Sequence, residues 1–387
     1  MSDAPRAAGS HFRLVRWLAR DRFTVVSILL LAGLPAGCGD DEPTGPTPGV
    51  EADLVALNST GQTLAPFRVS GNSVIPAGSP VDLGAGFDGV GVALHGSIAA
   101  STVSSFGGSR VVLVDLSDGL VAEAVFPGPE PALVNPSRAG FDPEGVLWVG
   151  GRGSDAVYRL SPGAGVATTV ATDVGTFVER VVPAGDELFA IDANLDDDGG
   201  TYEPLGRGRV VVLSRAGAPL AVIELPADAP NPADALLAGN RLIVLAGGTF
   251  DPTTFAPNSD GALVTIDPDS RQVISSRTLD ANGVNLALGA DGKVYVTTTE
   301  DYLSLALLRF DPQSGSFDRG PSNPVETRDG SDARVDCWTA TALPDGRIVC
   351  STFRTDAPGR MLLLNPDGTA ISETGSGFGT TDIGVRD

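Results

Sequence analysis

Short apolar segments recur along residues 51–387, and turns rich in Gly, Asp and Pro separate them. The clearest copy of this pattern is Gly283–Gly315, with the sequence GVNLALGADGKVYVTTTEDYLSLALLRFDPQSG. It predicts a short apolar strand, an Asp-Gly turn, a β-branched and aromatic strand, an apolar third strand and a Pro-containing turn. A more polar fourth strand follows such turns, so the pattern predicts an all-β fold of four-stranded units.

Six copies of this unit can be aligned, and we label their strands A to D with A innermost. The A strands, together with a last one near the C-terminal end, are predicted at Val81–Ala85, Ser137–Phe141, Phe177–Val182, Ala233–Leu237, Asn285–Ala290, Trp338–Leu343 and Thr380–Val385. In the first copy, Val90–Leu94 is then strand B and Arg110–Asp115 is strand C. The repeat averages about 50 residues, which is typical of a β-propeller.

The two ends of the repeat region predict one further blade. Asp53–Leu57 and Thr63–Val69 resemble strands C and D without an A strand, whereas Thr380–Val385 resembles an A strand with nothing after it. Pairing them in space would form a seventh blade, in which strand B is either present or missing, and would close the ring and remove its exposed sheet edges. We therefore predict an all-β, seven-bladed β-propeller as a single domain over residues 51–387. Seven blades are favoured over six or eight, and a propeller over a β-sandwich.

The B strand of the clearest copy carries a family motif. Lys293–Thr298 (KVYVTT) resembles the K-x-Y-V-T-N strand of YVTN/NHL-type bacterial propellers, and Asp291-Gly292, Asp345-Gly346 and Asp367-Gly368 resemble their recurrent turns. The resemblance covers residues 51–387 as a pattern and implies the propeller fold. Because that group contains binding proteins, scaffolds and a few enzymes, the resemblance indicates fold more than activity.

Residues 1–37 have the features of a lipoprotein signal peptide. Arginines precede the apolar segment Phe23–Gly37, which at about 1.5 Å per residue is shorter than the ~30 Å hydrocarbon core of a membrane. Leu34–Cys38 (LPAGC) resembles a bacterial lipobox, which implies cleavage before Cys38 and lipidation of Cys38. An ordinary signal peptide and an uncleaved anchor remain open. Residues 38–50 are polar and rich in Pro and Gly, which predicts a flexible tether.

The overall charge narrows the classes of partner. The chain has 26 basic and 48 acidic side chains, a formal net charge of −22. Nucleic-acid binding is disfavoured because no basic patch is available to neutralise phosphates. We expect an exported protein of the bacterial cell envelope, on the outer-membrane or periplasmic side, that touches the membrane through its lipid anchor only. Its partner is expected to be an envelope protein or a glycan.

One polar residue near the start of each A strand predicts a ring at the mouth of the central channel. The ring consists of Asp82, Arg138, Glu179, Asp234, Asn285, Thr339 and Asp382. It has two interpretations: a funnel that binds polar or cationic ligands, and a set of side chains that cap backbone groups and hold water. Long B–C loops are predicted on the same face at His95–Ser109, Asp192–Gly208 and Ala246–Gly261, and insertions on one face of a repeat protein often mark the binding side.

An acidic loop in the third copy is a candidate calcium site. Its oxygen-bearing residues are Asp192, Asn194, Asp196, Asp198 and Glu203, with Gly199 after the last of the alternating oxygens. Ca²⁺ takes six to eight hard oxygen ligands, and alternate residues of a tight loop can converge on one ion. Neither register of the calcium-loop pattern is complete, so a solvated acidic loop remains the alternative.

Catalytic constellations are scarce in the sequence. His95 is the only histidine after the signal peptide, which leaves little material for a histidine zinc site or a Ser-His-Asp triad. Gly283–Ala287 is loosely similar to the Asn-bearing strand of gluconolactonase-like propellers, and that resemblance implies Glu179, Asn285 and Asp382 as metal ligands. The leading hypothesis is a binding or scaffold protein that acts through its long-loop face. The alternative is a metal-dependent lactone or sugar-acid hydrolase.

Cys337 and Cys350 are the remaining cysteines, and an exported protein can hold a disulfide. If Cys350 pairs across a hairpin with Thr341, Cys337 lies ~13 Å further along the strand at about 3.3 Å per residue. A disulfide and two buried thiols therefore both remain open. Trp148 and Trp338 are expected to pack between blades.

Overall fold

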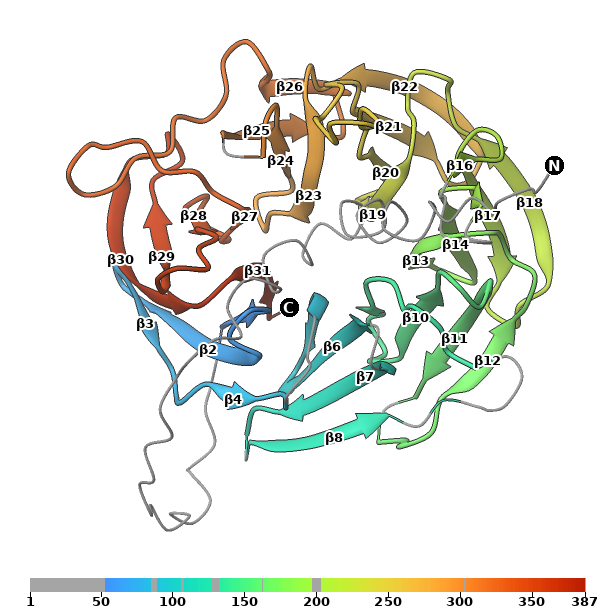
Figure 1. Cartoon of the computed structure of the whole chain (residues 1–387), viewed down its shortest axis with the longest axis horizontal. Helices are drawn as coiled ribbons and strands as arrows, with labels where there is room; N and C mark the ends of the chain where they lie inside the picture. Colours follow the sequence, from blue (N-terminus) through green and yellow to red (C-terminus); the bar gives the residue numbers. More distant parts are fainter. Residues whose placement is uncertain are drawn as a thin grey trace, which may run out of the picture.

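The computed structural model describes residues 53–84, 89–105, 108–117, 119–124, 126, 132–161, 163–196, 203–302 and 304–386. Within these ranges all regular structure is β-strand, and seven sheets are arranged around a central axis (Figure 1). No helix in this part of the chain is long and apolar enough to cross a membrane. The predicted signal peptide, Cys38 and the tether lie outside the described residues.

Each sheet is one blade of four antiparallel strands, which run in order from the innermost strand outward. Blades 1 to 3 are β5 (Gly89–His95), β6 (Ile98–Ser105), β7 (Gly108–Asp115), β8 (Leu120–Ala124); β9 (Gly140–Phe141), β10 (Leu147–Gly151), β11 (Ala156–Leu160), β12 (Thr168–Ala171); and β13 (Val178–Ala184), β14 (Glu187–Asp192), β17 (Arg209–Ser214), β18 (Pro219–Glu224). Blades 4 to 6 are β19 (Pro232–Ala238), β20 (Arg241–Ala246), β21 (Ala262–Asp267), β22 (Gln272–Thr278); β23 (Asn282–Leu288), β24 (Val294–Thr299), β25 (Leu305–Asp311), β26 (Ser316–Arg319); and β27 (Thr339–Ala342), β28 (Ile348–Ser351), β29 (Gly359–Leu364), β30 (Ala370–Gly377).

Blade 7 joins the two ends of the described chain. It consists of β31 (Thr380–Val385), β1 (Leu54–Asn58), β2 (Thr63–Ser70) and β3 (Ser73–Pro76), and β4 (Val81–Asp82) adds to β2. In Figure 1 the blue strands β2 and β3 therefore lie beside the red strands β30 and β31. The predicted closure of a seven-bladed ring is confirmed. The predicted strands C and D at this end are the second and third strands of a complete blade, and β3 is the outermost.

The prediction for the first blade was wrong by one strand. The predicted A strand at Val81–Ala85 contains β4, which pairs with β2 of blade 7, and the predicted B strand lies in the inner strand β5. The stretch His95–Ser109, predicted as a long loop, contains the second strand β6. Gly96 at φ 58° allows a two-residue turn that pairs His95 with Ile98. The Ser- and Ala-rich sequence of β6 has few of the large apolar side chains that identify the other strands.

Apolar side chains from neighbouring blades form the core between sheets. Trp148 of blade 2, for example, is 1% exposed and belongs to the same cluster as Val181 and Leu188 of blade 3. Its indole N–H donates a hydrogen bond to Asp142, at 2.9 Å. Because every blade packs on two neighbours in this way, the inner strands hold their ends in a fixed ring around the axis.

Candidate functional site

The inner strands all begin on one face, which we call the mouth face. Antiparallel order places the connections between second and third strands, and between successive blades, on this same face. In several blades the inner strand has a β-bulge near its start, where one extra residue shifts the register against the second strand. The residues that directly follow the bulge are Gly91, Arg180, Asp234, Asn285 and Asp382, and they therefore occupy equivalent positions.

Asp82 does not belong to this ring, contrary to the sequence-based prediction. It lies in β4, pairs with Thr63, and is exposed. The equivalent position in blade 1 is Gly91, where an added Cβ would lie 3.0 Å from Cγ of Arg138 and 3.2 Å from Oδ2 of Asp382. Glycine at this position therefore leaves room for two charged side chains from other blades.

Arg138 is the centre of the charged network at the mouth. Its Nη1 lies 3.1 Å from Oδ2 of Asp234, so the side chain of blade 2 reaches past blade 3 to blade 4. The two side chains are 14% and 8% exposed. Burial would lower the pKa of Arg138, but the charges of Asp382, Asp234 and Glu179 outweigh burial and raise this pKa above its ordinary value. Arg138 is therefore a permanent cation held among carboxylates.

The carboxylates of the ring already have partners. Asp234 also lies 3.6 Å from Nε of Arg180, and Glu179 lies 2.7 Å from Nη2 of Arg152. Asp382 accepts hydrogen bonds from the backbone N–H groups of Val92 and Ile383, each at 3.0 Å. These contacts favour the capping interpretation of the ring over a funnel for cations, because a cation would have to displace existing partners.

The other side of the ring is uncharged. Asn285 in blade 5 is 3% exposed, and among the described residues its Nδ2 has no hydrogen-bond partner. Thr339 begins the inner strand of blade 6 and is 2% exposed. Blades 5 and 6 thus supply an amide and a hydroxyl residue where blades 2, 3, 4 and 7 supply charged side chains.

Two long loops lie on the mouth face, in blades 3 and 4. The loop of residues 193–208 contains a small sheet of β15 (Leu195–Asp196) and β16 (Glu203–Pro204). The loop of residues 247–261 is held by Asp260, which accepts hydrogen bonds from the backbone N–H and the hydroxyl of Thr249, both at 2.6 Å. Asn282 donates to the carbonyl of Thr249 at 2.8 Å, so the loop is tied to blade 5.

The proposed calcium ligands are only partly described. Asp192 is fully buried, and its carboxylate accepts hydrogen bonds from backbone N–H groups of Phe177 and Asn194, each at 2.9 Å, and from Nε of Arg209 at 2.8 Å. The carboxylate of Asp192 therefore stabilises the fold, and its oxygens are already occupied by these donors. Asp198 and the side chain of Glu203 lie outside the described residues, while Asp196 is half-buried in β15. Across the described ranges, no three His, Cys, Asp or Glu side chains are grouped to hold a metal.

Two aromatic pairs on the mouth face were not predicted from the sequence. The rings of Phe250 and Tyr302 stack with centroids 5.9 Å apart and an interplanar angle of 9°, and Tyr302 is 38% exposed. The half-buried rings of Trp338 and Phe353 have centroids 4.9 Å apart. Trp338 thus contacts a loop residue of its own blade, in addition to any packing between blades. Aromatic residues soon after the predicted B strands of blades 4 to 6 were the sequence signal that could have revealed these pairs.

The histidine of the domain lies away from the mouth. His95 ends the inner strand β5, on the face opposite to the mouth face, and its ring lies 5.7 Å from that of Phe141. No histidine among the described residues can therefore take part in chemistry at the channel mouth.

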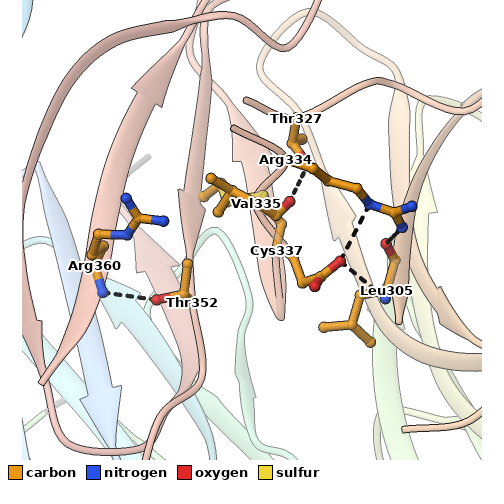
Figure 2. Close-up of a disulfide and its surroundings, with 9 residues drawn as sticks. Leu305, Thr327, Arg334, Val335, Cys337, Thr352 and Arg360 are labelled. Carbon is orange, nitrogen blue, oxygen red and sulfur yellow. Dashed lines mark hydrogen bonds and ion pairs between the residues drawn. A yellow bond between two sulfur atoms is a disulfide. The ribbon is translucent and has the colours of Figure 1, made fainter. Parts of the chain in front are cut away.

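A disulfide joins Cys337 to Cys350, with Cα atoms 5.6 Å apart (Figure 2). In the ladder, Cys350 faces Ala340 rather than Thr341, and Cys337 lies before the start of β27. The expected ~13 Å separation was wrong because the chain before Thr339 does not continue as a straight strand. Nearby, Arg334 donates to the carbonyl of Leu305 at 2.9 Å, which fixes this segment against blade 5 (Figure 2).

Solved structures resemble this arrangement at low sequence identity. Hydrazine synthase of Kuenenia stuttgartiensis matches with a TM-score of 0.53 and 16% identity, over 81% of this chain and 96% of that chain. A catalytically inactive virginiamycin B lyase of Staphylococcus aureus matches with a TM-score of 0.53 and 11% identity, over 79% and 90% of the two chains. The computationally designed Ika8 protein matches with a TM-score of 0.52 and 11% identity, over 87% and 90%.

The chain is a seven-bladed β-propeller. At identities this low, the likeness shows the fold alone. Neither a protein-family model nor a curated protein sequence matches the chain. Function must therefore be argued from the site.

Proposed function

We propose that this protein is an exported, lipid-anchored β-propeller, of the YVTN/NHL type that the KVYVTT strand resembles, and that it binds an envelope component through its mouth face. The observation that carries the proposal is the asymmetry of the two faces. The long loops 193–208 and 247–261 and both aromatic pairs lie on the mouth face, whereas the turns of the opposite face are short. A rigid ring that presents loops and aromatic side chains on one side is suited to binding.

The hydrolase alternative receives less support from the geometry. It would use Glu179, Asn285 and Asp382 as metal ligands, but Glu179 is ion-paired with Arg152 and Asp382 is hydrogen-bonded to the backbone. Arg138 adds a fixed positive charge close to the same acids. A divalent cation would therefore meet an arginine and occupied carboxylates, which makes binding without catalysis the better-supported function.

Partner capture from the envelope fraction tests the proposal. In one variant, residues 300–304, which join the corresponding strands of blade 5, replace the loop of residues 247–261. A matched control, Asp269→Ala, changes an exposed turn residue on the opposite face. We expect the wild type and the control to capture the same partner and the loop variant to lose it, with all three folded by circular dichroism. Equal capture by all three would refute binding through the mouth face.

The lipid anchor is tested separately. Cys38→Ala should move the protein from the membrane fraction to the soluble periplasmic fraction, because one lipidated cysteine is the proposed attachment. Mass spectrometry of the wild-type N-terminus should detect a lipid-modified Cys38. Membrane association that persists in Cys38→Ala would instead support an uncleaved anchor.

A further inference from the structure

Asn285 is a buried donor for which the described part of the chain supplies no acceptor. It follows the bulge in β23 at the position that Asp234 occupies in β19. Since the Asp234 side chain meets Arg138 across the mouth, this position faces the channel. Buried polar groups are almost always hydrogen-bonded, because an unsatisfied donor is costly. An acceptor atom of a bound ligand would satisfy the Nδ2 donor of Asn285.

The charges around Asn285 restrict what can supply that acceptor. Arg138 and Arg180 are both close to Asp234, Asp382 is held by backbone N–H groups, and Glu179 is paired with Arg152. A strongly charged ligand would have to separate these pairs, and breaking a buried pair is unfavourable. The mouth therefore suits a neutral ligand that carries oxygen acceptors.

The aromatic pairs supply flat apolar surfaces on the same face. Tyr302 and Phe255 both adopt left-handed backbone conformations, with φ of 66° and 60°, which are uncommon for aromatic residues. The hydroxyl of Tyr302 donates to the carbonyl of Phe255 at 2.8 Å, so the two loops hold each other in this conformation. Unfavourable backbone conformations that the surroundings maintain are concentrated at functional sites. They keep the Tyr302 ring stacked on Phe250 and partly exposed.

We propose that the mouth face binds a neutral carbohydrate at the side formed by blades 5 and 6. A sugar hydroxyl or ring oxygen accepts a hydrogen bond from Nδ2 of Asn285, and the apolar face of a sugar ring stacks on the exposed ring of Tyr302 or the half-buried ring of Trp338. A sugar combines oxygen acceptors, no net charge and a flat C–H surface, which are the three properties that the site requires. This inference rests on the proposed binding function and names its ligand class.

Calorimetry on the full-length protein in detergent tests the proposal with neutral tetrasaccharides of glucose, xylose, mannose and N-acetylglucosamine. At least one should bind with a Kd between the micromolar and millimolar ranges. Asn285→Leu should weaken that binding about tenfold, which corresponds to ~1.4 kcal/mol, and should raise the Tm because the unsatisfied amide is gone.

Thr265→Val is the matched control for Asn285→Leu. Thr265 in β21 is 1% exposed, and its Oγ1 also has no hydrogen-bond partner among the described residues, but it lies on the third strand of blade 4. The Thr265→Val variant should raise the Tm and leave saccharide affinity unchanged. Equal affinity of Asn285→Leu and the wild type would show that the amide is a structural feature only, and would overturn the proposal.

Two substitutions at Tyr302 test the stacking surface. Tyr302→Phe keeps the ring and removes the hydroxyl, whereas Tyr302→Asn removes the ring at a positive φ that asparagine tolerates. We expect a loss of less than tenfold for the former, because the ring remains but its hydrogen bond to Phe255 is gone, and a loss of tenfold or more for the latter. No binding of any tetrasaccharide at about 10 mM, or binding of Ca²⁺ or a hexa-arginine peptide instead, overturns the inference. If no saccharide binds but partner capture still depends on loop 247–261, the proposed binding function stands and only the carbohydrate inference fails.

Discussion

The two sides of the channel mouth differ in charge. On one side, Arg138 of blade 2 and Arg180 of blade 3 lie close to Asp234 of blade 4. On the other side, blades 5 and 6 carry the uncharged residues Asn285 and Thr339. The strand geometry is similar, because Asp234 and Asn285 follow the same bulge in their blades. One side joins blades 2, 3 and 4 by ion pairs, and the other leaves an amide without a partner in the described chain. The fold thus provides the positions, and single residues decide whether a position joins blades or faces a ligand.

The largest effect is expected from removing the centre of the charged side. Arg138→Ala should lower the free energy of unfolding by about 3 to 5 kcal/mol, since it leaves the buried carboxylate of Asp234 with only the longer contact to Arg180 and removes the positive charge near Asp382. Urea denaturation is the suitable measurement, because guanidinium salts screen ion pairs. The double variant with Asp234→Ala should lose less than the sum of the two single losses. A loss below about 1 kcal/mol for Arg138→Ala would contradict the network.

The uncharged side is expected to depend on its disulfide instead. Replacing both Cys337 and Cys350 by Ala should lower the free energy of unfolding by about 3 kcal/mol, because the cross-link restricts a short loop of the unfolded chain. Urea denaturation with and without reductant measures this effect, and Cys38→Ala is the control that keeps the bond. Two titratable thiols in the unfolded, non-reduced Cys38→Ala protein would show that the bond is absent.

A substitution of Asp192 in blade 3 tests whether this residue stabilises the fold or binds a metal. Asp192→Asn should lower the free energy of unfolding by about 2 kcal/mol, because the new amide group would face Arg209 in place of an oxygen. The loss should be the same with and without millimolar Ca²⁺, since the carboxylate is already occupied. Thermal unfolding with Ca²⁺ or a chelator measures both. A Tm increase on adding Ca²⁺ that disappears in Asp192→Asn would instead assign a metal ligand role to this residue.

The smallest effect concerns acid stability near blade 6. Hydrogen bonds from Ser331 and Arg360 hold the pKa of Asp329 well below its ordinary value of 3.8. A lowered pKa in the folded state means that this stabilisation is complete above pH ~5 and is lost as the pH falls toward 2. Asp329→Asn should therefore unfold with a shallower pH dependence in this window, measured by circular dichroism. Equal slopes for variant and wild type would show that Asp329 makes no contribution.

Much of the architecture could be predicted because strand periodicity and turn residues are local properties. The pattern in Gly283–Gly315 predicts its strands nearly at their observed bounds, and the pairing of Thr380–Val385 with the N-terminal strands follows from an incomplete repeat count. The first blade was misassigned because the Ser- and Ala-rich β6 has a weak apolar pattern.

The site was less predictable because β-bulges and contacts between residues far apart in sequence determine which side chains lie at the channel mouth. One extra residue in β13 places Arg180, and not Glu179, at the position equivalent to Asp234. The ion pair between Arg138 and Asp234 joins residues from blades that are not neighbours, so no local pattern indicates it. The stacking of Phe250 on Tyr302 likewise depends on how two loops meet in space.

The pairing of β1 with β31 has a consequence for the order of folding. Leu54 finds its partner in Val385, so the ladder that completes blade 7 joins the two ends of the described chain. Bringing these two ends of the described chain together costs about 5 kcal/mol of conformational entropy. Contacts within blade 7 offset this cost only once the last strand, β31, is present. Blades 1 to 6 can form from contacts between residues that are near in sequence. During this time the edge of β1 that later pairs with β31 remains unpaired. A protein delivered across a membrane from its N-terminus would thus protect its earliest strand last, and loss of only β31 would leave that edge available for aggregation.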